Sequence, residues 1–163
     1  MKHRIAHAVM VILAVLGIVT LKPEVARAQS KGIVASATAG FQVTFGGAER
    51  TVEFAAQRDS ANNSRGEGHL FNHVTSTKIH FVIDCLNVVG NVATISGTID
   101  HSDVASFPEG TPIWLRVVDN GEGRKSPPDL VSPLFAIFGP PVACTTPLAA
   151  ATLAIEGGNI QVH

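Results

Sequence analysis

Apolar and polar residues alternate along most of the chain after residue 30, and a period of two predicts β-strands rather than helices. The clearest case is the run IHFVIDCLNVV, which starts at Ile79 and is followed by Gly90-Asn91 and then by VATISGTID. Two β-rich runs joined by two turn-forming residues are typical of a β-hairpin. The pattern therefore predicts a central hairpin over residues 79–100.

The register of this hairpin stays open. Alternation gives its first run one face with Ile79, Phe81, Ile83 and Cys85, and another with His80, Val82, Asp84 and Leu86. A strict two-residue turn sets Phe81 opposite Asp100, which is incompatible with a single buried face. Either the first run is buried on both faces, or a β-bulge shifts the register.

Turn-rich stretches of Gly, Asn, Ser and Pro separate six further apolar segments. These segments predict strands over residues 40–45, 50–57, 65–74, 112–119, 130–138 and 158–163. Residues 31–39 are expected to form a first strand or an ordered arm, and residues 147–155 favour at most one short helix. About eight strands with hairpin-length connections predict an all-β antiparallel meander, forming a barrel or a sandwich.

The first 28 residues have the pattern of a secretory signal peptide. Basic residues near Met1 precede an apolar run from Ala8 to Leu21, and Ala26-Arg27-Ala28 has the small-x-small form of a cleavage site. We expect cleavage before Gln29, one β-domain over residues 29–163, and a secreted or periplasmic location. The apolar run is shorter than the roughly 20 residues that a membrane span needs, and an uncleaved anchor is the alternative reading. Nothing later in the chain is long and apolar enough to span a bilayer, so no stable membrane insertion is expected after cleavage.

The charge of the predicted mature chain excludes one class of partner. Removing residues 1–28 leaves eight Lys and Arg against twelve Asp and Glu, a net charge of −4. The basic residues are scattered, so the electrostatic footprint of a nucleic-acid-binding protein is missing and no nucleic-acid partner is expected.

Cys85 and Cys144 are the two cysteines of the chain. Because disulfides persist in exported proteins, we expect these two residues to pair; a reactive thiol and an intermolecular bridge are the alternatives.

Five histidines follow the predicted cleavage site. His69 and His73 would lie on one face of a regular strand about 13 Å apart, too far for one metal ion. A two-residue turn at Gly90-Asn91 sets His80 opposite His101, a pair that would bind zinc or copper if a third ligand were added. The alternative is that these are ordinary surface histidines.

A second metal hypothesis concerns the segment VVDNGEG. Asp119, Asn120 and Glu122 supply three oxygen-bearing side chains within four residues, which is chemistry that calcium accepts. The segment lacks EF-hand spacing, and a structural turn with Asx hydrogen bonds is the alternative. We expect no organic cofactor.

Sequence templates for catalysis are absent. The chain has no G-x-S-x-G, H-E-x-x-H, Walker or G-x-G-x-x-G motif. Asp84 and Asp100 on the hairpin form the remaining carboxylate pair for acid–base work, but the strict register places them on opposite faces.

Three segments carry a resemblance. They are KIHFVIDCLNVVGNVATISGTI, VVDNGEG followed by PPD, and the terminal GNIQVH. In these strings the chain resembles a group of small exported bacterial β-domain proteins to which no chemistry has been assigned. The resemblance covers about half of the predicted mature chain, implies a secreted β-domain, and carries over no functional residue.

The sequence thus favours a secreted or periplasmic non-catalytic β-domain that acts as a binding or structural module. Its partner would be a small molecule, a glycan or a protein, and in a barrel the interior would accept an apolar ligand. The alternatives are a hydrolase or lyase that uses the acidic residues of the hairpin, and a calcium- or zinc-binding domain.

Overall fold

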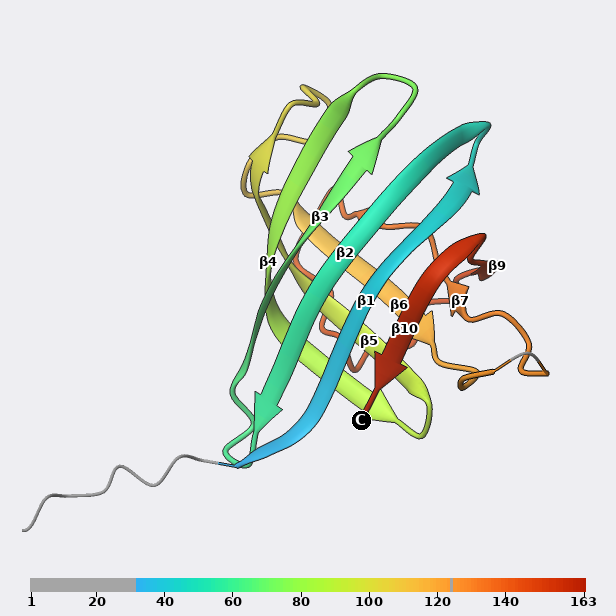
Figure 1. Ribbon diagram of the computed structural model, residues 1–163. Helices are drawn as coiled ribbons and strands as arrows, with labels where there is room; N and C mark the ends of the chain where they lie inside the picture. Colours follow the sequence, from blue (N-terminus) through green and yellow to red (C-terminus); the bar gives the residue numbers. More distant parts are fainter. Residues whose placement is uncertain (1–31, 124) are drawn as a thin grey trace, which may run out of the picture.

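A computed structural model describes residues 32–123 and 125–163, and all regular structure in this part of the chain is β (Figure 1). The predicted signal peptide, residues 1–28, lies outside the described residues. The strands are β1 (Ile33–Phe45), β2 (Ala48–Asp59), β3 (Ser64–Asn72), β4 (Thr77–Val89), β5 (Val92–Ser102), β6 (Pro112–Val118), β7 (Leu130–Val131), β8 (Phe135–Ala136), β9 (Leu153–Ala154) and β10 (Gly157–Val162).

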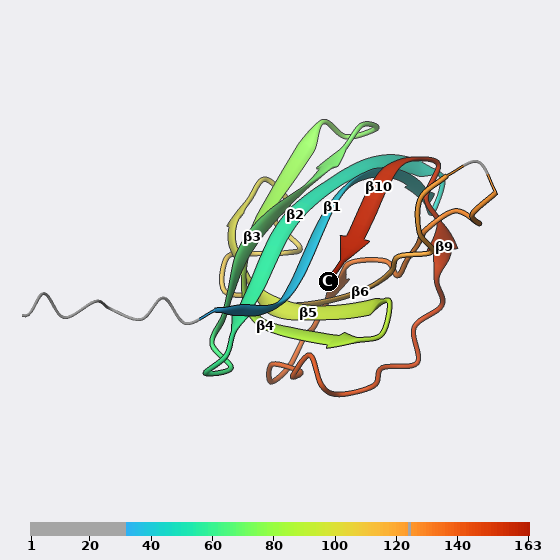
Figure 2. The same cartoon turned by 60° about the horizontal axis from the view of Figure 1, so that its bottom comes forward.

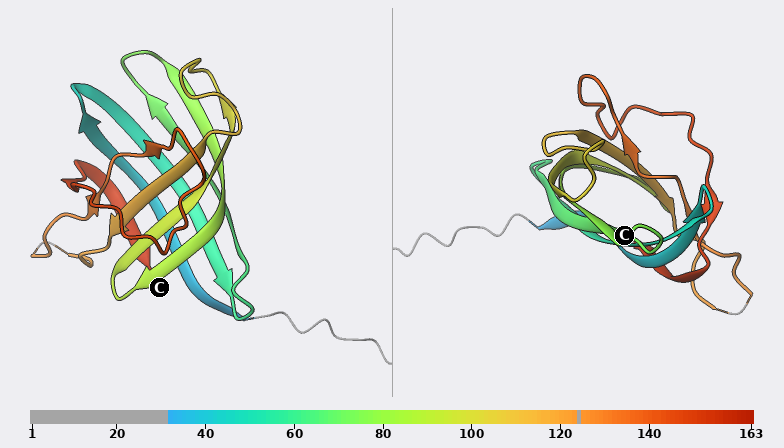
Figure 3. Two further views of the ribbon diagram at one scale, coloured as in Figure 1. Left: turned by 180° about the vertical axis from the view of Figure 1, so that it is seen from behind. Right: turned by 90° about the horizontal axis from the view of Figure 1, so that it is seen from above.

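The strands form one antiparallel sheet in the order β10-β1-β2-β3-β4-β5-β6-β7-β9, with β8 paired to β6. Consecutive strands are neighbours from β1 to β7, as a meander requires. The sheet curls into a half-barrel around a common interior (Figures 2 and 3). The predicted all-β meander is confirmed, and of the two packings left open by the sequence the barrel-like one is formed.

The interior is filled by alternate residues of the long strands, because successive side chains of a strand point to opposite faces. Its largest fully buried apolar side chains include Phe41, Phe81, Leu86, Ile95, Ile99, Ile113 and Leu115. The outer face of β1 to β4 carries mostly exposed residues.

Two bulges decide the register of the central hairpin. The turn at Gly90-Asn91 pairs Val89 with Val92, as predicted, but the register shifts by one residue at Asp84 and shifts back at Asp100. The two unpaired residues are exposed. Phe81 is therefore opposite Ile99 rather than Asp100, and an apolar pair faces the interior.

The bulge at Asp84 also corrects the expected faces of this run. Leu86, 2% exposed, continues the interior face of Phe81 and Ile83, whereas Cys85 lies on the opposite side of the sheet. A bulge adds one residue to a strand and so reverses the alternation beyond it.

Cys85 forms the predicted disulfide with Cys144, with a Cα–Cα distance of 5.7 Å. The bond holds the segment after β8 against the outer face of β4, β5 and β6. Beneath this segment Trp114 is 1% exposed and lies 6.1 Å from Phe135, ring centroid to centroid. One part of the outer face is thus covered (Figure 3), which the sequence pattern did not predict.

Two expected elements differ. The strand expected over residues 130–138 is two short strands, β7 and β8, interrupted by Pro133, which lacks the amide hydrogen that a continuous ladder uses. Residues 147–155 form no helix and contribute only β9. No helix in the described residues is suited by length and hydropathy to cross a membrane.

The two ends of the sheet meet where β9 leads into β10. The Ile155 amide donates to the carbonyl of Asp129 beside β7 (3.0 Å), and the next amide, of Glu156, donates to the carbonyl of Gln42 in β1 (2.8 Å). The carboxylates of Asp119 and Asp129 also accept hydrogen bonds from amides of β10. These backbone and side-chain contacts together close the half-barrel on that side.

Candidate functional site

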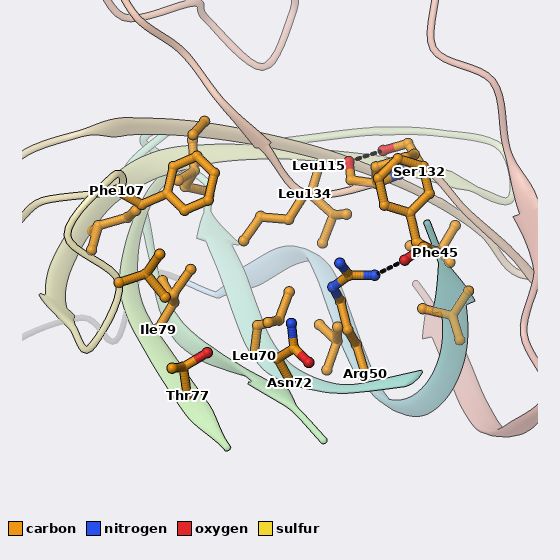
Figure 4. Close-up of a pocket in the computed structure, with 18 of the residues that line it drawn as sticks. Phe45, Arg50, Leu70, Asn72, Thr77, Ile79, Phe107, Leu115, Ser132 and Leu134 are labelled. Atoms are coloured by element: carbon orange, nitrogen blue, oxygen red, sulfur yellow. Dashed lines mark hydrogen bonds between the residues drawn. The ribbon is translucent and has the colours of Figure 1, made fainter. Parts of the chain in front are cut away.

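The half-barrel encloses a cavity of about 460 Å³. Its walls come from the inward faces of the long strands and from the segments that follow β5 and β7. Figure 4 shows Leu70, Ile79, Phe107, Leu115 and Leu134 directed toward the same space. Volume and lining both fall within the range of small-molecule sites, which are concave and largely apolar.

The mouth of the cavity carries its polar groups. It lies where the β1–β2 and β3–β4 hairpins turn, near Phe45, Asn72 and Thr77, with Asp103 on the segment after β5. Phe45 lines the cavity although 46% of its surface is exposed. An apolar ligand inside the cavity would thus have polar side chains next to the end that lies at the mouth.

Arg50 is the cationic group of this mouth (Figure 4). Its guanidinium donates to the carbonyl oxygens of Phe45 and Ala48, the latter at 3.0 Å, and lies 5.4 Å from the centroid of the Phe45 ring. Within the described residues no carboxylate pairs with Arg50. The side chain is held in place by the backbone while its charge is unneutralised.

The carboxylate that lines the same cavity is already engaged. Asp103 accepts a hydrogen bond from the amide of Lys78 (3.0 Å) and lies 3.7 Å from the imidazole of His101. Arg50 is therefore the charged group left to meet a ligand there.

Sequence reasoning missed Arg50, although a signal was present. It continues the inward positions of β2, which are Val52, Phe54 and Ala56, so it is an arginine in phase with a buried apolar face. The segment with Phe107 carried no periodic pattern, and Leu134 belongs to the stretch expected to form one strand over residues 130–138. The place of both residues over the cavity depends on tertiary packing.

A second hollow lies on the outer face of the sheet, lined by Glu53, His69, His80 and His101 among others. The predicted opposition of His80 and His101 is confirmed, and β3 places His69 opposite His80 on the other side. Three histidines thus form one row across three neighbouring strands. His73 lies beyond β3, with Nε2 2.8 Å from Thr51 Oγ1, and does not join the row.

The proposed calcium ligands have other partners. Asp119 accepts from the amides of Gly121 (2.7 Å) and Val162 (3.0 Å), Asn120 donates to the carbonyl of Pro128 (2.7 Å), and Glu122 accepts from the side chain of Asn159 (2.8 Å). These contacts have the form of the structural turn that was the alternative.

Asp129 belongs to the same arrangement. One of its carboxylate oxygens accepts from the Asn120 amide (2.8 Å) and the other from the Ile160 amide (2.9 Å). The edge amides of Ile160 and Val162 in β10 therefore find carboxylates of the β6–β7 loop in place of a further strand. As the side chains stand, the described residues contain no three His, Cys, Asp or Glu groups arranged around a metal position.

The carboxylate pair considered for catalysis is not brought together. Asp100 lies at one bulge with its oxygen 2.6 Å from His80 Nδ1, whereas Asp84 is exposed at the other bulge and lines neither hollow.

Comparison with known proteins adds no family to these observations: no family model, no curated protein and no solved structure matches the chain.

Proposed function

We propose that this chain is an exported binding module whose half-barrel holds an amphiphile with an aliphatic body and an anionic end, such as a medium-chain carboxylate. The observation that carries the proposal is an apolar cavity of about 460 Å³ with the unneutralised Arg50 at its mouth. Burial of each methylene contributes about 0.8 kcal/mol, so an alkyl chain supplies most of the affinity.

The anionic end is inferred from Arg50. A guanidinium presents several donors in a planar fork that suits a carboxylate, and a hydrogen bond between charged groups contributes roughly 1.5–3 kcal/mol. Asn72 and Thr77 stand at the same edge and supply further polar contacts. The described residues that line the interior end of the cavity carry no comparable charge, so the anionic end of such a ligand would stay at the mouth.

Export is supported by the leader pattern in residues 1–28 and by the Cys85–Cys144 bond, since disulfides persist in oxidising compartments. The intact mass of protein recovered from the exported fraction tests this part. A mass that corresponds to Gln29–His163 less two hydrogens is expected; a chain that retains residues 1–28 would contradict it.

Binding is tested by titrating the purified protein with dodecanoate and with dodecanol, followed by calorimetry. We expect both to bind with one site, and the carboxylate to bind about tenfold more tightly, as a single charged hydrogen bond implies. Arg50→Gln should remove this preference while leaving dodecanol binding unchanged.

Leu134→Gln places a polar group in the cavity wall and should weaken both ligands by about tenfold or more. Val82→Gln is its matched control, because Val82 is an exposed residue that does not line the cavity. The proposal would be refuted if the unmodified protein bound neither ligand. Equal losses of affinity in Leu134→Gln and Val82→Gln would refute it as well.

A further inference from the structure

The row of histidines on the outer face has the elements of a metal site. His69 in β3 is opposite His80 in β4, and His80 is opposite His101 in β5. Directly opposed residues have Cβ atoms about 4.5–5.5 Å apart, so an ion above His80 is within reach of an imidazole on each side. All three line one hollow together with Glu53.

The central imidazole is already oriented for this role. Asp100 Oδ1 lies 2.6 Å from His80 Nδ1, which leaves Nε2 of that ring for a ligand. Metal-binding histidines commonly donate their other ring N–H to a carboxylate, and this contact fixes the tautomer and raises the basicity of the binding nitrogen.

The flanking imidazoles also face carboxylates. His101 Nδ1 lies 3.4 Å from Glu109 Oε1, and its Nε2 lies 3.7 Å from Asp103 Oδ1. His69 Nε2 lies 3.4 Å from Glu53 Oε2, so the Glu53 carboxylate lies beside the row and can supply an oxygen ligand to a metal ion. Lys78 is the cation of this hollow, and its Nζ is positioned over the Phe71 ring, 5.8 Å from the centroid.

We propose that His69, His80 and His101 bind one divalent first-row transition-metal ion, Zn²⁺ or Cu²⁺, with Glu53 as a fourth ligand and Asp100 as the positioning residue of His80. As they stand the three rings do not converge, so His69 and His101 must rotate toward His80. Their side chains are 49% and 68% exposed, and exposed side chains change rotamer within nanoseconds. Three imidazoles with a carboxylate or water complete the tetrahedral set that zinc prefers.

Calorimetric titration of the purified protein with ZnCl₂ tests the site, and Co²⁺ absorption reports its coordination. We expect one ion per chain and four-coordinate cobalt bands. His80→Ala and His101→Ala should each weaken binding at least tenfold. Asp100→Asn should weaken it by about 10-fold, the lower end of the effects seen for residues that hydrogen-bond to a metal-binding histidine.

His73→Ala is the matched control, since His73 is an exposed histidine outside the row. His73 and His101 are exposed residues, so His73→Ala and His101→Ala should keep the melting temperature of the metal-free protein. His80 is partly buried and bonded to Asp100, so the melting temperature of His80→Ala without metal is measured to separate loss of the site from loss of folding. The proposal is overturned if zinc does not bind, if cobalt remains six-coordinate, or if His73→Ala weakens binding as much as His80→Ala. It does not depend on the cavity, and a failure of either proposal leaves the other in place.

Discussion

Asp129→Asn tests whether side-chain carboxylates close the half-barrel. Asp129 is 6% exposed, and its two oxygens accept from the amides of Asn120 and Ile160 at 2.8 and 2.9 Å. The first contact orders the β6–β7 loop, and the second holds the edge of β10. Asparagine has nearly the same shape but keeps one acceptor and turns an NH₂ group toward the other amide.

The expected cost follows from these contacts. A hydrogen bond to a charged group contributes roughly 1.5–3 kcal/mol, and a buried amide that loses its acceptor costs a comparable amount. Allowing for overlap between the two effects, we expect Asp129→Asn to lower the free energy of unfolding by about 2–4 kcal/mol. With an m-value of roughly 2 kcal/mol/M, the urea midpoint falls by about 1–2 M.

Urea unfolding followed by fluorescence measures this loss, because the buried Trp114 is the single tryptophan of the chain. Asp84→Asn is the matched control: Asp84 is exposed at a bulge, and its side chain has no hydrogen bond or ion pair with the described part of the chain. Surface substitutions of this kind usually stay within about 0.5 kcal/mol of zero. If Asp129→Asn differs from Asp84→Asn by less than that, the carboxylates do not hold the edge of β10.

Two further predictions concern the sheet itself. Replacing both Cys85 and Cys144 by Ala should lower the free energy of unfolding by about 4 kcal/mol, since the bond links residues 59 positions apart; a loss below about 1 kcal/mol in the same urea assay would contradict the loop-closure estimate. Gly97→Ala should destabilise by more than about 2 kcal/mol, because its Cβ would lie 1.9 Å from the carbonyl oxygen of Val82. Gly40→Ala is the control, with no atom nearer than 3.9 Å, and equal melting temperatures for the two variants would show that β4 and β5 are not packed as described.

Local patterns in the sequence predicted the features of the fold that depend on residues close together in the chain, namely the central turn and most of the long strands. The two-residue turn at Gly90-Asn91 fixed the pairing of Val89 with Val92, and the alternation of apolar residues located most long strands. The bulges remained undecided because their position depends on which face is buried, and burial is set by the whole sheet.

In the candidate sites, too, the local sequence predicted some of the contacts, and tertiary structure determined the others. The pairing of His80 with His101 followed from the turn, but His69 joins them only through the register of β3 with β4. Asp119 and its neighbours had the composition of a calcium loop, yet the amide of Val162 at the nearby edge of β10 donates to the Asp119 carboxylate. Composition identifies donors and acceptors, and tertiary structure decides which groups they meet.

The two bulges of the central hairpin act on both faces of the sheet. In the strict register Asp100 would lie opposite Phe81 and bring a carboxylate into the core, where desolvation of an unpaired charge is costly. The bulge at Asp84 instead brings Ile99 opposite Phe81 inside, and Asp100 is left unpaired and exposed. The bulge at Asp100 then restores the pairing of His80 with His101, and the Asp100 carboxylate lies 2.6 Å from His80 Nδ1. Together the two bulges preserve an apolar interior and assemble the polar row outside, so their positions link the fold to both proposed sites.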